Sequence, residues 1–243
     1  LNLLMMPFYT DVLGLDSALA GTVFLLASLW DGFADTIIAA IADRTRSRWG
    51  SYRPYLVFAS PVLVVAFALA FLTPDWEQGG LFLYALLSQV FLRTAYSVVS
   101  IPYSSLSARI SQDADERASM AGWRMVFAFA GGAVVTFAMP QLVSALGGDE
   151  NSTTYVLAAG LVGLVSLPFF WLTFLTTSEP PRLVEANPRG FSLTGGADDL
   201  RASLAMARHN GPLMRIFGCI IVSSLAFTMT NKCLVYYVTY HLG

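Results

Sequence analysis

Two carboxylates lie four residues apart inside a long apolar segment. Asp31 and Asp35 are separated by about 40° in projection on a helix of about 3.6 residues per turn, and Ser28 shares their face one turn earlier. Two carboxylates this close do not readily ionise together unless a cation binds between them. The pair predicts a binding site for Na⁺ or a proton. The competing interpretation is a structural ion pair with an arginine on another helix.

A later apolar segment contains an arginine and a row of serines at helical spacing. Counted from the flanking loops at about 1.5 Å per residue, Arg93 lies at about the same membrane depth as Asp31. It could therefore neutralise that carboxylate and replace a metal cation permanently. The serines either line a cavity or allow helices to pack closely. They are Ser97, Ser100, Ser104 and Ser107.

Two more cations lie in the following apolar segments. The guanidinium fork of Arg124 suits paired sugar hydroxyls or a carboxylate, and the alternative is that it extends to the membrane surface. Lys232, next to Asn231, is a candidate charge-pair or coupling residue from a second helix bundle. A charge inside the membrane costs about 2.5–3.5 kcal/mol on insertion scales, so such residues are expected to face a bundle interior or a cavity.

The composition indicates a membrane protein. Hydrophobic residues make up 56% and charged residues 12% of the 243 residues, whereas soluble domains contain about a quarter charged residues. Spans of about 20 residues leave room for six or seven helices. The net charge of −2 does not favour a nucleic-acid partner. We find no nucleophile–base pair, metal cluster or phosphate-binding glycine loop, so neither an enzyme nor a cofactor is expected.

The apolar runs predict an all-α membrane protein, because they are too long and too uniformly apolar for barrel strands. We expect an incomplete first helix that ends near Phe8, and we interpret the chain as truncated at its front and at its end. The other helices are expected at about 17–42, 55–73, 81–106, 119–146, 154–176 and 213–240.

The loops alternate in charge along the chain. Arginines occur in loops 43–54, 107–118 and 178–212, while the intervening loops contain only acidic charges. The positive-inside rule places the basic loops in the cytoplasm. Segment 178–212 combines proline, glycine and mixed charge, so it is predicted to link an amino-terminal bundle (1–177) to the first helix of a second bundle (213–243).

A series of short motifs follows in a fixed order along the chain. They are Phe8-Tyr-Thr-Asp-Val-Leu-Gly-Leu, Leu29-Trp-Asp-Gly-Phe-Ala-Asp, Asp43-Arg-Thr-Arg-Ser-Arg-Trp-Gly-Ser-Tyr-Arg-Pro, Ile101-Pro-Tyr-Ser-Ser-Leu, Asp115-Glu-Arg and Trp123-Arg. Together they resemble the glycoside–pentoside–hexuronide:cation symporter family of the major facilitator superfamily. The similarity extends over nearly the whole chain, and the Thr-Arg-Ser-Arg-Trp-Gly loop is specific.

The resemblance implies a twelve-helix fold, of which this chain would supply the amino-terminal six-helix half, the linker and the seventh helix. By position, Asp31 and Asp35 match the family's cation-binding carboxylates, and Ser97 matches a nearby hydroxyl ligand. Asp43 and Arg44 fall in a cytoplasmic loop that is expected to latch the two bundles together as a gate.

The resemblance also implies a solute site. Arg124 matches a sugar-contacting arginine, and Ser100, Tyr103 and Ser104 are expected near the solute. Several positions depart from the family's pattern. Among them, Ser100 replaces a sugar-binding aspartate, Ser104 replaces a tryptophan and Ala34 replaces an asparagine between the two carboxylates. A galactoside is therefore a poor candidate for the solute.

The expected function is symport of a sugar, glycoside or uronide with H⁺ or Na⁺, by alternating access, in a monomeric carrier of the bacterial inner membrane. Arg93 stands where the family has a small residue, so one alternative is a cation-independent facilitator in which Arg93 replaces the coupling ion. Another is a carrier of a lipid or other amphipathic solute with the same fold. An intramembrane aspartyl protease would need carboxylates from separate helices, and a non-transporting sensor or truncated relic is the remaining alternative.

Overall fold

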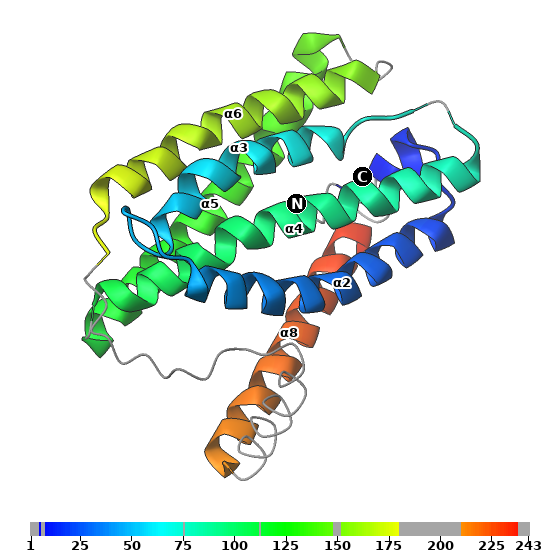
Figure 1. The fold of residues 1–243 in the computed structure, drawn as a ribbon. Coiled ribbons are helices and arrows are strands. Elements are labelled where there is room, and N and C mark those ends of the chain that lie inside the picture. The colour runs from blue at the N-terminus through cyan, green and yellow to red at the C-terminus, as the bar shows by residue number, and fades with distance from the viewer. Residues whose placement is uncertain are drawn as a thin grey trace. The chain divides into compact units, whose positions relative to one another are not determined.

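The structure, a computed structural model, describes Met5 and residues 8–74, 76–111, 113–147, 152–179 and 210–237 (Figure 1). All regular elements in these ranges are helices, which confirms the predicted all-α class. The chain divides into two compact units, Leu1–Leu183 and Val184–Gly243. The first unit contains η1 (Phe8–Val12), α2 (Ser17–Arg44), α3 (Arg53–Leu69), α4 (Gln78–Ile110), α5 (Ala114–Leu146) and α6 (Ser152–Thr176), and the second contains α8 (Gly211–Tyr237).

Four of the described helices, α2, α4, α5 and α6, are long and apolar enough to cross a membrane. Helix α3 has 17 residues, at the lower limit of about 17 for a span. Large apolar side chains point outward on the long helices, such as Phe137 (73% exposed) and Leu175 (74% exposed). An apolar surface of this extent requires lipid or further helices around it.

Local hydrogen bonds set the helix boundaries. Asp16 begins α2 by accepting a hydrogen bond from the Ala18 N–H at 2.8 Å, and Asp113 begins α5 by accepting from the Asp115 N–H at 2.8 Å. Such side-chain caps satisfy N–H groups that have no partner within the helix. The cap at Asp113 explains why α5 starts five residues before the expected position, in a polar segment that the apolar pattern does not mark.

The expected end of the first helix was wrong. Its final turn, η1, continues to Val12, because the Leu13 N–H donates to the Phe8 carbonyl at 2.8 Å and the Leu15 N–H donates to the Tyr9 carbonyl at 2.9 Å. Helix α3 is also shorter than expected and ends at Leu69 instead of Thr73. Beyond it, tight turns lead to Pro74, which cannot donate a helical hydrogen bond.

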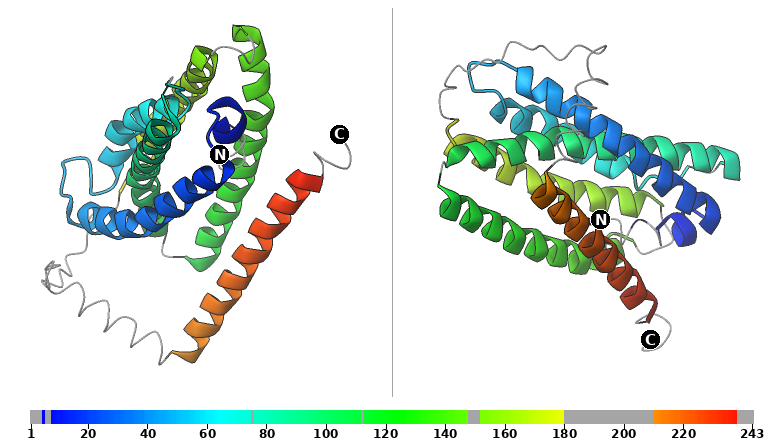
Figure 2. Two further views of the ribbon diagram at one scale, coloured as in Figure 1. Left: turned by 90° about the vertical axis from the view of Figure 1, so that its right-hand side faces the viewer. Right: turned by 90° about the horizontal axis from the view of Figure 1, so that it is seen from below.

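Within the first unit, α2 packs on α4, α3 packs on both α4 and α6, and α5 packs on α6. Figure 2 shows η1 at one end of this unit, between α2 and α5. The η1 side chains Phe8 and Tyr9 are buried in a core that includes Met139 and Val143 of α5. Close approach of α3 to α6 depends on Gly163, where an added Cβ would lie 2.7 Å from Val64 Cγ1.

We call the opposite end of the unit the basic end. Helices α2 and α4 end there with Arg44 and Arg109 in their last turns. Helix α6 also ends there, and α3 begins there with Arg53. A second, smaller core fills this end. It consists of Ala42, Tyr52, Leu56, Val99 and Leu106.

Candidate ion and solute site

An ion pair joins α2 to α4 within their membrane-spanning parts. Arg93 Nη1 lies 2.9 Å from Asp31 Oδ2, and the two side chains are 17% and 30% exposed. In the same turn, Trp30 Nε1 donates a hydrogen bond to Thr94 Oγ1 at 2.9 Å. The structure therefore brings together the arginine and the carboxylate whose equal depth was predicted by counting residues from the loops.

Asp35 carries a buried oxygen atom that has no hydrogen-bond partner in the structure. Its Oδ1 atom is buried and accepts no hydrogen bond, and the same holds for Asp31 Oδ1. Among the described residues, Asp35 forms no ion pair. A buried polar atom without a partner is costly, and such atoms in a native structure call for an explanation. The two carboxylates thus retain unused capacity to bind a proton or a cation.

Ser97 occupies the matching position on the facing helix. Helices α2 and α4 run in the same direction (Figure 1), so one turn beyond the Asp31–Arg93 pair leads to Asp35 on α2 and to Ser97 on α4. Ser97 is buried. In the described part of the chain, no group of three or more histidine, cysteine or acidic side chains could hold a metal ion.

The residues expected near the solute are only partly brought together. Arg124 Nη1 on α5 donates to Ser104 Oγ on α4 at 3.2 Å, and the Arg124 guanidinium carbon lies 6.0 Å from the centre of the Tyr103 ring. Ser100 lies one turn before Ser104 on the same helix and is half-buried. Arg124 is exposed, so its remaining N–H groups can reach a ligand. The arrangement presents donors, hydroxyls and an aromatic ring at one place.

The predicted gate residues lie at the basic end. The buried Tyr52 donates its hydroxyl to Asp43 Oδ1. Arg44 is the last residue of α2 and is exposed. The side chain of Lys232 lies outside the described residues, so its predicted role remains a prediction.

Sequence reasoning missed a carboxylate at the basic end. Glu179, just beyond α6, accepts hydrogen bonds through Oε2 from the Ser51 N–H at 2.7 Å and the Tyr52 N–H at 3.2 Å. Its Oε1 lies 4.0 Å from Arg109 Nη1, and its side chain is 7% exposed. The two N–H groups precede the first turn of α3, where a helix favours an anion. We call Glu179, Gly50, Ser51, Tyr52 and Arg109 the Glu179 clamp.

Gly50 makes room for this carboxylate. Its φ angle is +107°, and an added Cβ would lie 2.1 Å from Glu179 Oε2. The end of α6 is held a second time by Arg53, whose Nη2 donates to the Phe174 carbonyl at 2.5 Å and whose guanidinium lies 4.6 Å from the Phe174 ring centre. One sequence signal was available: Glu179 is an acidic residue directly after an apolar run, at an end where the other charges are mostly basic.

The fold and these intramembrane charges define a multi-pass integral membrane protein. The whole chain, residues 1–243, matches the family described as MFS/sugar transport protein, and it belongs to that family. It is 36% identical over 242 residues to the inner membrane symporter YicJ of Escherichia coli (strain K12), covering 99% of this chain and 50% of that protein.

Two further relatives from the same organism also match this chain. The putative glycoside/cation symporter YagG is 33% identical over 172 residues, covering 71% of this chain and 37% of the relative. The glucuronide carrier protein homolog is 29% identical, covering 99% of this chain and 51% of the relative. The chain therefore spans about half the length of YicJ and of the glucuronide carrier protein homolog.

Proposed function

We propose that the protein containing this chain is a secondary transporter that moves a sugar, glycoside or uronide together with a proton by alternating access. Family membership and relatives named as symporters support transport. The observation that carries the coupling proposal is the buried, partnerless Oδ1 atom of Asp35 beside the Asp31–Arg93 ion pair.

The charge balance of this site favours a proton over Na⁺. Arg93 contributes a permanent positive charge 2.9 Å from Asp31, so a single uncompensated carboxylate, Asp35, remains. A proton needs one acceptor atom, whereas hard metal cations take several oxygen ligands. Moving one positive charge down a potential of about 100 mV releases about 2.3 kcal/mol, which supports roughly a fifty-fold accumulation of the solute.

Arg124 and its neighbours suit a hydroxylated or anionic ring. Its guanidinium can donate to paired hydroxyls or to a carboxylate, Ser104 and Ser100 add hydroxyl groups, and the Tyr103 ring gives a flat apolar face against which a sugar can lie. A relative named as a glucuronide carrier homolog favours an acidic sugar among these solutes.

Alternating access needs a second bundle, and we place it beyond the linker. In this proposal 1–177 forms the amino-terminal bundle, 178–212 is cytoplasmic, and 213–243 begins the second bundle. Asp43 and Arg44 would close the cytoplasmic side when the two bundles meet. The contact between Tyr52 and Asp43 holds one of these residues in place at the basic end.

The coupling proposal is tested with the full-length carrier in proteoliposomes. Uptake of a glucuronide and of a neutral glycoside is measured under an imposed proton gradient, an imposed Na⁺ gradient, or neither. We expect accumulation above equilibrium only with the proton gradient. Accumulation driven by Na⁺ at constant pH would refute proton coupling.

A second candidate function is favoured by the same ion pair. If Arg93 replaces the coupling cation completely, the carrier is a facilitator and Asp35 has only a structural role. Uptake would then reach the external concentration and no more, whichever gradient is imposed. The proteoliposome experiment separates this outcome from both symport mechanisms.

A further inference from the structure

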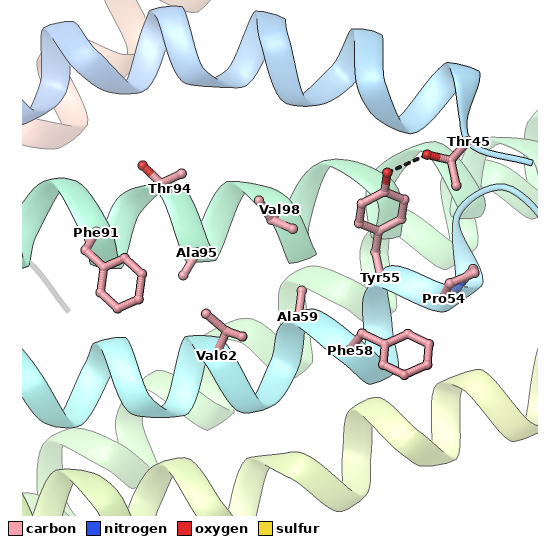
Figure 3. A pocket seen from close by; sticks show the side chains of 10 residues that line it. All are labelled: Thr45, Pro54, Tyr55, Phe58, Ala59, Val62, Phe91, Thr94, Ala95 and Val98. Carbon is pink, nitrogen blue, oxygen red and sulfur yellow. Dashed lines mark hydrogen bonds between the residues drawn. The ribbon is translucent and has the colours of Figure 1, made fainter.

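A groove of about 410 Å³ lies between α3 and α4, and Thr45, just beyond the end of α2, also lines it (Figure 3). Helix α3 contributes Tyr55, Phe58, Ala59 and Val62, and α4 contributes Phe91 and Val98. Asp31, Arg93 and Arg124 do not line the groove, although Thr94, which lines it, is the neighbour of Arg93 in α4. Nothing in the proposed transport mechanism uses it.

The groove has no free polar group that could hold a sugar. The hydroxyls of Thr45 and Tyr55 are bonded to each other at 2.5 Å. The Thr94 hydroxyl accepts from Trp30 Nε1 and donates to the Val90 carbonyl at 2.7 Å. The polar atoms on its wall are therefore already satisfied, and an apolar occupant fits this lining best.

The groove is open to the surroundings of the helices. Phe58 is 62% exposed, Val62 is 46% exposed and Phe91 is 42% exposed. Side chains of this kind on membrane-spanning helices contact hydrocarbon in place of water. A lipid acyl chain is an occupant with the right polarity and a linear shape.

Positive charge follows one end of the groove along the chain. Thr45 and Pro54 line that end (Figure 3), and the loop between them carries Arg46 and Arg48, both exposed. In the part of the chain that the structure describes, neither arginine forms an ion pair. By contrast, the structure engages Arg53 and Arg109 with α6 and with Glu179.

A stack of three side chains connects this charge to the apolar wall. The Arg48 guanidinium carbon lies 4.4 Å from the centre of the Trp49 ring, and the Trp49 ring lies 5.9 Å from the ring of Phe58, which lines the groove. Tryptophan is enriched at the depth of lipid headgroups. These contacts therefore connect an exposed cation to the apolar lining of the groove through a tryptophan.

We propose that this groove binds one acyl chain of an anionic phospholipid, whose phosphate is bound by Arg46 and Arg48. Charge complementarity selects an anionic headgroup over a zwitterionic one, because each arginine near the membrane surface contributes about 1 kcal/mol to binding of anionic lipid. The apolar lining determines where the chain lies, and the loop determines which headgroup is retained. This inference stands independently of the coupling ion and the transported solute.

The test is native mass spectrometry of the full-length carrier, released from detergent with phosphatidylglycerol or with phosphatidylcholine of the same acyl chains. We expect phosphatidylglycerol to be retained preferentially. Arg48→Gln should lower its retention about five-fold, and Arg48→Lys should restore most of it. The matched control is Arg117→Gln, which removes an exposed arginine from the start of α5 and should leave retention unchanged.

The groove itself is tested by filling it. Val62→Trp should displace the lipid, whereas Val65→Trp, an exposed valine of α3 outside the groove, should not. Equal retention of both lipids by the wild type would overturn the headgroup assignment. Unchanged retention in Val62→Trp would show that the lipid does not occupy the groove. Failure of a Val62→Cys variant to react with a lipid-soluble maleimide would show that a helix of the carrier covers the groove. Either result would overturn the proposal.

Discussion

Two regions of the first unit hold carboxylates beside arginine, and they differ in how completely the protein satisfies the oxygen atoms. In the Glu179 clamp, Oε2 accepts two backbone hydrogen bonds and Oε1 lies 4.0 Å from Arg109. In the α2–α4 site, Arg93 pairs with one oxygen of Asp31, while Asp31 Oδ1 and Asp35 Oδ1 are buried without a partner.

We interpret this difference as one between a structural carboxylate and a carboxylate that can bind a proton or an ion. A buried charge that accepts hydrogen bonds from backbone groups, as Glu179 does, stabilises one geometry. A buried oxygen with no partner carries a free-energy cost that a bound proton or ion can remove. We therefore expect substitutions in the clamp to change stability and substitutions in the α2–α4 site to change coupling.

The largest effect is expected for Asp35→Asn. The amide cannot bind and release a proton, so the solute should equilibrate without accumulating, a loss of about fifty-fold at a potential of about 100 mV. Exchange of labelled for unlabelled solute needs no net proton movement and should continue. The measurement is accumulation against exchange in proteoliposomes, with the exposed Asp115→Asn as control. Accumulation with wild-type ion dependence would show that Asp35 does not couple.

Gly50→Ala should be the most damaging substitution in the clamp. The new Cβ would need the space of Glu179 Oε2, 2.1 Å away, in a backbone conformation with φ +107°. The left-handed conformation alone costs about 1–2 kcal/mol, so we expect a total loss of stability of about 2 kcal/mol. Thermal unfolding of the carrier in nanodiscs measures it. The same substitution in a Glu179→Ala background should cost less, and an equal cost in both backgrounds would show that the carboxylate is not displaced.

Arg93→Ala should change ion dependence more than stability. Without the guanidinium, Asp31 and Asp35 form a site with two uncompensated carboxylates, which can attract a metal cation. We expect Na⁺ to stimulate uptake about ten-fold, a difference of about 1.4 kcal/mol, where the wild type shows no stimulation. Arg93→Lys keeps the charge and should stay independent of Na⁺. If Arg93→Ala also ignores Na⁺, Arg93 does not act as a tethered cation.

The pairing in the α2–α4 site was predictable from sequence, although Asp31 and Arg93 are far apart in the chain, because the depth of a residue in a membrane helix follows from simple helix geometry. Apolar length sets where a helix crosses the membrane, and a constant rise per residue sets depth, so Asp31 and Arg93 could be matched before any contact was known. The sequence could not predict that Asp35 Oδ1 has no hydrogen-bond partner, because this depends on which polar groups of the neighbouring helix α4 lie within reach of it.

The clamp was not predictable because its parts are far apart in the chain. Glu179 bonds to Ser51 across 128 residues, and the loop accepts it only because Gly50 adopts a positive φ. The sequence alone shows a glycine at position 50 and a glutamate at position 179, but it does not show that the two residues are in contact. The same limit explains the error at η1, where hydrogen bonds to Phe8 and Tyr9 extend the turn through residues whose polarity suggested an end.

The smallest effect is expected for Glu179→Gln, and it isolates the charge in the clamp. The amide oxygen can still accept from the N–H groups of Ser51 and Tyr52, so only the attraction to Arg109 and to the start of α3 is lost. A charge at a helix N-terminus contributes about 0.3–1 kcal/mol, and the partly exposed Arg109 adds little, so we expect a loss of about 1 kcal/mol in thermal unfolding. Proton-driven accumulation should remain at the wild-type level, because Glu179 is fixed to the backbone of Ser51 and Tyr52 at the basic end, away from the Asp31–Arg93 pair. If Glu179→Gln instead abolishes accumulation while the protein unfolds at the wild-type temperature, a carboxylate that accepts two backbone hydrogen bonds takes part in coupling, and hydrogen bonding of the carboxylates does not distinguish the two regions.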